Sequence, residues 1–334
     1  METLTATFKI VTPMFLGDAQ QNAVDIRPPS VKGALRFWWR AMMWGKVLQE
    51  AQNKPVQALK NLHEQEADLF GCSAGIYKEK HFGQAKFLLQ VIHGEPTNEK
   101  SYPIKSTKST GSAYLGYGLM ESKPPRNAMK EGLEFKLHFT FKPTATKEDI
   151  ESIKQVLEVF GLFGGLGSRS RRAFGSITSG DNIFDKKEAY EQKLAAILTL
   201  GKNITSYPPY AAFSSFTKYK VLFEANSARE AQEKAGNAYK NWRGQVKQKY
   251  EKQADKIKSL LAFGIPLKGG TDQDKEARFA SPLFFHIHPV GDKFVCVALF
   301  LPSLFHPTYF KKYFKETNNK SLTEFYKDVS DFIA

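Results

Sequence analysis

Apolar and polar residues alternate at the start of the chain and predict a β-strand at residues 3–11. Two prolines followed by Ser30 predict a helix start with Ser30 as the N-cap, and apolar residues at helical spacing carry this helix over 31–44. A threonine three positions before Asp149 predicts a capped helix over 146–160. The other predicted elements of this series are a helix at 56–70 and strands at 85–93, 133–141 and 174–178.

These strands and helices follow an order that is typical of a ferredoxin-like, or RRM-like, fold: strand, helix, strand, strand, helix, strand. A stretch rich in lysine, serine, glycine and proline at 97–128 shows no periodicity and is interpreted as a long surface insertion. The composition changes at 202–209, which indicates a linker. The first predicted domain therefore spans residues 1–200.

The second predicted domain, residues 201–334, repeats this pattern in a degenerate form. A strand at 215–223 precedes a long basic helix at 228–261. Two further strands, at 283–288 and 294–301, and a terminal helical region follow. The sequence thus predicts an α+β protein in which two ferredoxin-like domains pack together.

The net charge indicates what kind of partner the chain binds. Among 334 residues, Lys and Arg number 48 against 34 Asp and Glu, which gives a formal charge of +14. A surplus of this size favours a polyanionic partner, because clustered cations attract phosphate groups. The charge alone does not identify the polyanion.

Cysteine usage and hydropathy exclude several classes of protein. Cys72 and Cys296 are far apart, which excludes a disulfide framework and a cysteine zinc site and fits a reducing cytoplasm. The longest apolar run, 294–302, is far shorter than the roughly twenty residues of a membrane span. The first residues also lack the layout of a signal peptide. We therefore expect a cytoplasmic protein without a membrane partner, and nothing in the sequence predicts a cofactor.

Three cations recur on one face of the first predicted helix. Lys32, Arg36 and Arg40 are spaced four residues apart, so their side chains stack along that face. The unpaired amides at the helix start add further donors for an anion. The alternative is an amphipathic helix whose cations are solvated or paired with acids elsewhere in the chain.

A glycine-arginine loop at 164–175 is the most informative stretch. Its glycines allow backbone amides to approach a bulky ligand, and its arginines supply forked donors that suit phosphate oxygens. No acidic residue lies between Gly161 and Gly180 to neutralise them. The loop lacks the Gly-Lys-Ser/Thr ending of a P-loop. A flexible glycine-rich connection with incidental charge is the alternative.

This loop and two other segments resemble a known family. Gly165-Leu166-Gly167, five residues and Ala173-Phe174-Gly175 resemble the glycine-rich signature of the RAMP superfamily of CRISPR proteins, with Ala173 in place of a glycine. Within that superfamily, the runs at 27–40 and 278–283 resemble the family of first-numbered RAMP subunits of type III-B, or Cmr, complexes. The resemblance extends from the first residues to about residue 302.

The resemblance implies a non-catalytic subunit in antiviral defence that binds guide RNA and target RNA near the 3′ end of the guide. It also implies assembly with other Cmr subunits, and cleavage of the target by a different subunit. The RNA would be single-stranded and held by its backbone, and the isolated chain could hold a nucleotide. One RNA-facing groove is then expected from the following residues: Arg27, Ser30, Lys32, Arg36, Arg40, Gly164, Gly165, Gly167, Ser168, Arg169, Arg171, Arg172, Arg278 and Ser281.

Two other hypotheses compete with RNA binding by a non-catalytic subunit. His286 and His288 lie two apart in a predicted strand and face the same side, as a metal-binding pair or an acid–base pair would. A metal-independent RAMP endoribonuclease that processes CRISPR RNA is therefore the alternative function. Histidines so placed are more often structural, so no catalytic or metal-binding residue is predicted. The third hypothesis is an assembly subunit whose basic surface meets acidic faces of other proteins.

Overall fold

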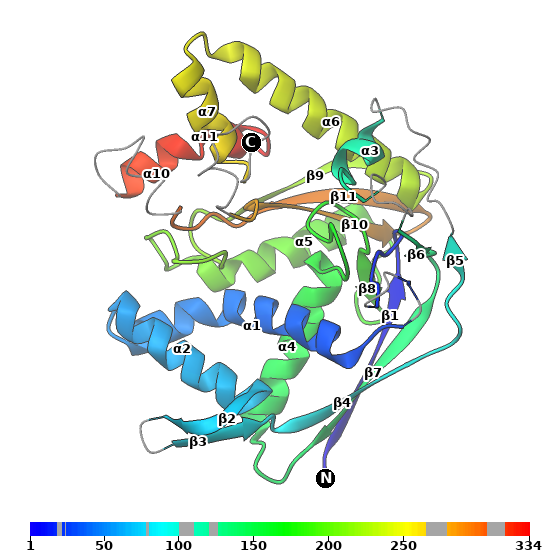
Figure 1. Cartoon of the computed structure of the whole chain (residues 1–334), viewed down its shortest axis with the longest axis vertical. Helices are drawn as coiled ribbons and strands as arrows, with labels where there is room; N and C mark the ends of the chain where they lie inside the picture. The colour runs from blue at the N-terminus through cyan, green and yellow to red at the C-terminus, as the bar shows by residue number, and fades with distance from the viewer. Residues whose placement is uncertain are drawn as a thin grey trace.

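A four-stranded and a three-stranded antiparallel sheet organise the chain (Figure 1). The computed structural model describes residues 1–18, 22–23, 25–77, 80–99, 110–119, 126–264, 279–305 and 318–334. Up to residue 201 the elements are β1 (Thr3–Ile10), α1 (Pro28–Glu50), α2 (Pro55–Phe70), β2 (Gly71–Tyr77), β3 (Lys80–Gln84), β4 (Phe87–His93), β5 (Asn98–Glu99), α3 (Gly111–Leu115), β6 (Ala128–Met129), β7 (Glu134–Phe141), α4 (Lys147–Phe163), β8 (Ile177–Ser179), α5 (Lys187–Leu198) and the 3₁₀ turn Thr199–Gly201. The later elements are β9 (Lys218–Ala225), α6 (Ala228–Lys249), α7 (Gln253–Leu261), β10 (Leu283–Val290), β11 (Lys293–Phe300), α10 (Asn319–Phe325) and α11 (Lys327–Asp331).

The four-stranded sheet has the strand order β4-β7-β1-β8, and α1, α2 and α4 cover one of its faces (Figure 1). Residues of β1 alternate between the two faces of the sheet, as the period of a strand requires. Phe8 points inward, where its ring lies 5.7 Å from that of Phe135 on β7 and 5.6 Å from that of Phe160 on α4. The alternation predicted for this strand is thus confirmed.

The three-stranded sheet has the order β10-β11-β9 and lies between α6 on one side and α1, α4 and α5 on the other (Figure 1). The edge strand β10 and the central strand β11 are buried on both faces along most of their length. Phe284, Val297 and Leu299 join the core that contains α1 and α4, whereas Phe285 and Ala298 join the core under α6. This explains the nearly continuous apolar run at 294–302, which serves two cores rather than one.

Several element boundaries differ from those predicted. The first helix begins at Pro28 and ends at Glu50, with Arg27 as its N-cap, so the assignment of Ser30 as N-cap was wrong. Ser30 lies in the first turn, where its amide donates to the carbonyl of Arg27 at 3.0 Å. The predicted helix 228–261 is two helices, α6 and α7, which are separated at residues 250–252. No helix within the described ranges combines the length and the apolar composition needed to cross a membrane.

The segment interpreted as a surface insertion, 97–128, contributes a short helix that packs on α6. The carboxylate of Glu233 on α6 accepts the first amides of α3, from Gly111 and Ser112, at 2.6 and 2.8 Å. A Cβ at Gly236 would lie 2.0 Å from the carbonyl oxygen of Gly111, so the two backbones approach as closely as glycine permits. The parts of this segment at 100–109 and 120–125 lie outside the described residues.

Candidate functional site

The glycine-arginine loop, residues 164–175, joins the end of α4 to β8 and is held by backbone hydrogen bonds. The amide of Leu166 donates to the carbonyl of Gly175, and the amide of Gly175 donates to the carbonyl of Pro13, both at 2.9 Å. Gly167 and Gly175 have φ values of +85° and +58°, and a Cβ at Gly175 would lie 2.1 Å from the carbonyl oxygen of Leu166. The loop therefore has a defined shape that requires glycine at both positions.

The middle of the loop presents backbone donors. Arg169 has a left-handed φ of +63°. The amides of Arg169, Ser170 and Arg171 donate to no acceptor among the residues that the structure describes. Successive amides around a left-handed residue form a concave donor site that favours an anion. The loop thus offers donors that are independent of its arginine side chains.

Arg171 lies beside two aromatic rings that also pack on each other. Its guanidinium carbon lies 5.0 Å from the ring centroid of Phe37 on α1 and 4.5 Å from that of Phe284 on β10. Its Nη1 donates to the carbonyl of Ser281 at 3.0 Å. Burial and the nearby charge of Arg172 lower the pKa of Arg171 to about 10, so the group stays cationic at pH 7. Its positive charge faces no carboxylate among the described residues.

The other two arginines of the loop turn in different directions. The guanidinium of Arg169, a residue with an exposed surface, donates to the carbonyl of Tyr117. The guanidinium of Arg172 lies 4.6 Å from the ring centroid of Tyr239 on α6. Its Nη1 is buried and has no hydrogen-bond partner among the described residues. Only Arg169 therefore presents an exposed side chain beside the free amides.

A half-open pocket of about 250 Å³ lies where α1, the loop and β10 meet. Gly165 and Ser170 of the loop belong to its lining. Aromatic rings and the Arg171 side chain supply most of its walls: Ala34, Phe37, Trp38, Phe163, Arg171 and Phe284. The pocket therefore joins α1 to the loop through apolar side chains.

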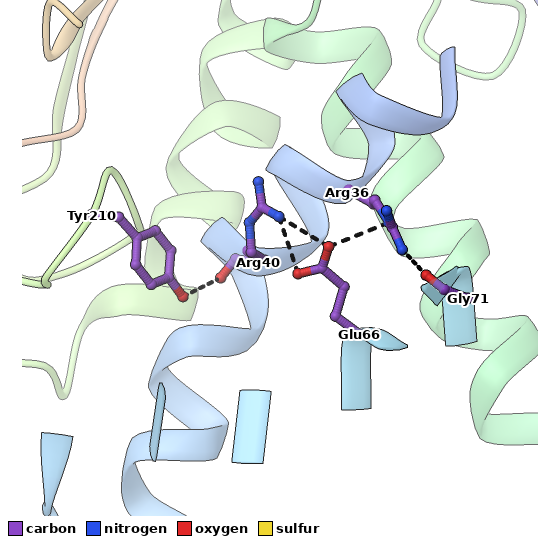
Figure 2. Close-up of polar contacts among 5 residues, drawn as sticks. All are labelled: Arg36, Arg40, Glu66, Gly71 and Tyr210. Carbon is purple, nitrogen blue, oxygen red and sulfur yellow. Dashed lines mark hydrogen bonds and ion pairs between the residues drawn. The ribbon is translucent and has the colours of Figure 1, made fainter. Parts of the chain in front are cut away.

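The cations of α1 are engaged within the chain (Figure 2). The carboxylate of Glu66 on α2 accepts from Arg40 Nη1 at 2.9 and 3.0 Å and lies 3.3 Å from Arg36 Nε. Arg36 also donates to the carbonyl of Gly71, and the Tyr210 hydroxyl donates to the carbonyl of Arg40 at 3.1 Å. Pairing with an acid, the alternative considered from the sequence, thus applies to Arg36 and Arg40.

Lys32 and the two paired arginines do not share a groove with the loop. The Lys32 ammonium lies 5.5 Å from the ring of Phe87 on β4. Burial, followed by the charges of Arg36 and Lys142, lowers the pKa of Lys32. Because helical residues are roughly 100° apart, the pocket residues Ala34 and Trp38 lie on the side of α1 opposite to this cationic face. The single groove expected from the sequence was therefore wrong in this respect.

The remaining candidate residues lie at the ends of these elements. Arg27 is exposed at the start of α1, and Ser30 is half-buried one turn later. Ser281 contacts the loop with its backbone, whereas its hydroxyl accepts the amide of Leu283 at 3.2 Å. Arg278 lies outside the described residues.

His286 and His288 are buried, and each has one ring nitrogen bonded to a backbone carbonyl. His286 Nδ1 donates to the carbonyl of Gly164, and His288 Nε2 donates to the carbonyl of Asn182, both at 3.0 Å. Burial lowers the pKa of His286 well below its usual range and that of His288 to about 4, so both rings are neutral at pH 7. Within the described part of the chain, no three metal-ligating side chains come together. His286 thus anchors the start of the loop to β10, and His288 anchors the turn after β8 to the same strand.

The segment that contains this loop identifies the family. Residues 7–178, just over half of the chain, match the RAMP superfamily. The chain belongs to the RAMP superfamily. The match ends at β8, so it includes α1 and the whole of the glycine-arginine loop.

Similar proteins extend this relationship over the rest of the chain. The chain is 23% identical over 325 residues to the CRISPR system Cmr subunit Cmr1-1 of Pyrococcus furiosus, covering 88% of this chain and 86% of that protein. It is 25% identical over 180 residues to subunit Cmr1-2 of the same organism, covering 50% of this chain and 89% of that protein. This RAMP protein thus resembles the Cmr1 subunit of type III-B complexes.

Solved structures show the same fold. The crystal structure of Cmr1 from Pyrococcus furiosus in its apo form matches with a TM-score of 0.63 and 20% identity, covering 100% of this chain and 97% of that chain. A chain of the type III-B Cmr-beta complex bound to cognate target RNA, solved by cryo-EM, matches with a TM-score of 0.62 and 14% identity, covering 100% of both chains. These likenesses concern the fold and cover the entire chain.

Sequence reasoning missed the walls of the pocket. Trp38 is buried in the core and also lines the pocket. Phe37 and Phe284 drew no attention, although an aromatic residue directly precedes Trp38 in the run at 27–40 that carries the resemblance. Aromatic residues interleaved with arginines in that run were the available signal.

Proposed function

We propose that this RAMP protein is a non-catalytic, RNA-binding subunit of a type III-B CRISPR effector complex in the cytoplasm. In this proposal it contacts the backbone of guide or target RNA near the 3′ end of the guide and assembles with other Cmr subunits. Membership of the superfamily and the likeness to Cmr1 proteins along the whole chain support this role. The formal charge of +14 supports a polyanionic ligand.

The observation that carries the proposal is the donor surface at the middle of the loop. Arg169, Ser170 and Arg171 present successive amides that find no acceptor within the described part of the chain, beside the exposed side chain of Arg169. Such a surface binds phosphate oxygens of any nucleotide, so binding should depend little on RNA sequence. Gly164, Gly165, Gly167 and Ser168 shape this surface, and Arg27, Ser30, Arg172, Arg278 and Ser281 remain proposed contacts.

We also propose that the two sheets belong to two ferredoxin-like domains, at 1–200 and 201–334. The first sheet has its strands in the order second, third, first and fourth. The second sheet repeats second, third and first, with α6 after its first strand as α1 follows β1. The second unit would then be a degenerate copy, in which the described residues contain no counterpart of the last strand.

A salt titration with a single-site variant tests RNA binding. Arg169→Ala removes one exposed guanidinium, and Lys60→Ala removes a matched exposed charge on α2. We expect Arg169→Ala to weaken binding of unrelated single-stranded RNAs to the same degree and to lower the slope of log affinity against log salt by about 0.7. Lys60→Ala should change neither quantity, measured by fluorescence anisotropy.

Equal affinities of the wild type and Arg169→Ala would contradict the proposed contact. If the wild type itself does not bind single-stranded RNA, the basic surface would instead serve assembly with other proteins. The same samples, incubated in EDTA, should return the RNA intact. Specific cleavage would replace this proposal by that of a metal-independent endoribonuclease.

A further inference from the structure

A pocket lies between α1, the loop and β10. Its aromatic side chains have no role in the proposed binding of the RNA backbone. We propose that the pocket receives one nucleobase of the bound single-stranded RNA, turned out of the strand while its phosphate lies on the loop. This inference rests on the proposed function and adds a base-binding subsite to it.

The walls of the pocket suit a flat, aromatic ligand. Rings from three elements line it: Phe37 and Trp38 from α1, Phe163 from the end of α4 and Phe284 from β10. The Trp38 ring lies 6.0 Å from that of Phe163 and 5.7 Å from that of Phe284, so these rings support one another. Trp38, Phe163 and Phe284 are buried, so the half-buried Phe37 offers the accessible ring face, on which a base of any identity can stack.

Arg171 gives the pocket a donor for the edge of a base. A guanidinium has five N–H donors, and one of those on Arg171 is used on the carbonyl of Ser281. Its guanidinium carbon lies close to the rings of Phe37 and Phe284, which places the remaining donors in an apolar setting. Carbonyl oxygens and ring nitrogens of bases accept from such a donor. A phosphate would lose much of its hydration among these rings, which favours the base as occupant.

The size and the lining of the pocket agree with a single nucleotide. A volume of about 250 Å³ lies just below the range of roughly 300–1,000 Å³ that is typical of sites for drug-sized ligands, so the pocket fits one ring system. Ser170 and Arg171 belong both to the pocket and to the run of free amides. A base inside the pocket would therefore have its own phosphate beside those amides.

Filling the pocket tests this inference without removing any donor. Ala34 lines the pocket from a helix, so Ala34→Phe places a ring where the base would lie. Two ligands are compared on the full chain: a short oligouridylate and an abasic ribose-phosphate oligomer of the same length. We expect Ala34→Phe to weaken oligouridylate roughly 5- to 150-fold and to leave the abasic oligomer unchanged. The matched control Ala195→Phe, on an exposed position of α5, should change neither affinity.

The outcomes separate the two proposals. If the wild type binds neither oligomer, the proposed function fails. If it binds both equally well and Ala34→Phe alters neither affinity, RNA binding stands and the base pocket is overturned. A second measurement guards against misfolding of the variant. The wild-type chain is photo-crosslinked to RNA that carries 4-thiouridine, and crosslinks at Phe37, Trp38 or Phe284 support the pocket, whereas crosslinks only outside it overturn the inference.

Discussion

Arg36, Arg40, Arg169 and Arg171 carry the same charge but have different neighbours. Arg36 and Arg40 share one carboxylate, Arg171 lies beside two phenylalanine rings, and Arg169 donates to a backbone carbonyl at the surface. A paired guanidinium has little charge to offer a phosphate, because the carboxylate already neutralises it. Whether an arginine side chain is available to bind RNA therefore depends on contact residues that are distant in sequence.

Glu66 provides a test of this distinction. In Glu66→Gln, a neutral amide replaces the carboxylate that accepts from Arg36 and Arg40, whose side chains are 30% and 38% exposed. We expect the free energy of unfolding, measured by urea denaturation, to fall by about 1–3 kcal/mol. RNA affinity should stay unchanged, because the freed cations lie on the side of α1 away from the pocket.

Asp181 is exposed and forms no ion pair with another described residue. Asp181→Asn therefore serves as a control, because it removes a negative charge without breaking an ion pair. A clear rise in RNA affinity in Glu66→Gln alone would show that Arg36 and Arg40 lie within reach of RNA. Such a result would support the RNA-binding cationic face that the spacing of Lys32, Arg36 and Arg40 predicts.

At the scale of elements, boundaries could be predicted where the deciding residues are close in sequence. Thr146 and Asp149 form the predicted cap of α4, with the Asp149 amide donating to the threonine hydroxyl at 3.2 Å and the Thr146 amide donating to Asp149 at 2.8 Å. The end of α1 depends on distant chain instead. Trp44 packs on Tyr210, and Gly45 approaches the carbonyl of Leu200, so the helix continues beyond the residue at which the pattern weakens.

The terminal helix α11 is tied to α6 and α7 by one buried carboxylate, which predicts a pH-dependent contact. Asp328 accepts from Lys249 at 2.6 Å, from Tyr250 at 2.7 Å and from the hydroxyl of Ser259. Burial alone would raise the pKa of Asp328, but these hydrogen bonds outweigh it and hold the pKa below its usual value of 3.8. The ionised carboxylate therefore stabilises the fold above pH about 4, and this contribution is lost as the pH falls through the folded-state pKa.

We expect Asp328→Asn to lower the free energy of unfolding by about 1–3 kcal/mol at pH 7, because three donors lose a charged acceptor. The difference between variant and wild type should shrink when urea denaturation is repeated at pH 3 and below. A difference that stays constant between pH 7 and pH 3 would mean that the charge of Asp328 contributes nothing and that only its shape matters.

At the scale of the molecule, the loop of the candidate site could be predicted from sequence and the pocket could not. The glycines and arginines of the loop are contiguous, so their chemistry is visible in one stretch. The pocket needs Phe37 from α1 and Phe284 from β10, and only the fold brings these rings within 5.7 Å of each other. The face of α1 that meets the loop is likewise set by which side of the helix the second sheet covers.

The contacts that build the pocket also join the two halves of the chain. The Trp38 ring lies 5.7 Å from that of Phe284, and the Trp44 ring lies 5.6 Å from that of Tyr210. The amide of Phe213 donates to the carbonyl of Ala41 at 3.1 Å. One hydrophobic core includes α1, α4 and the inner face of the second sheet, so neither half buries its apolar surface alone.

We therefore expect the chain to unfold as one cooperative unit, and the positions of its tryptophans allow a sharp test. Of the four tryptophans, only Trp242 lies beyond residue 200, so Trp242→Phe leaves fluorescence that reports the first half alone. In urea, the midpoint from this fluorescence should coincide with the midpoint from far-ultraviolet circular dichroism, which reports all helices. Two separated transitions would mean that the halves fold independently. The pocket between them would then be a seam between two separately stable bodies, and Ala34→Phe should shift only the fluorescence transition.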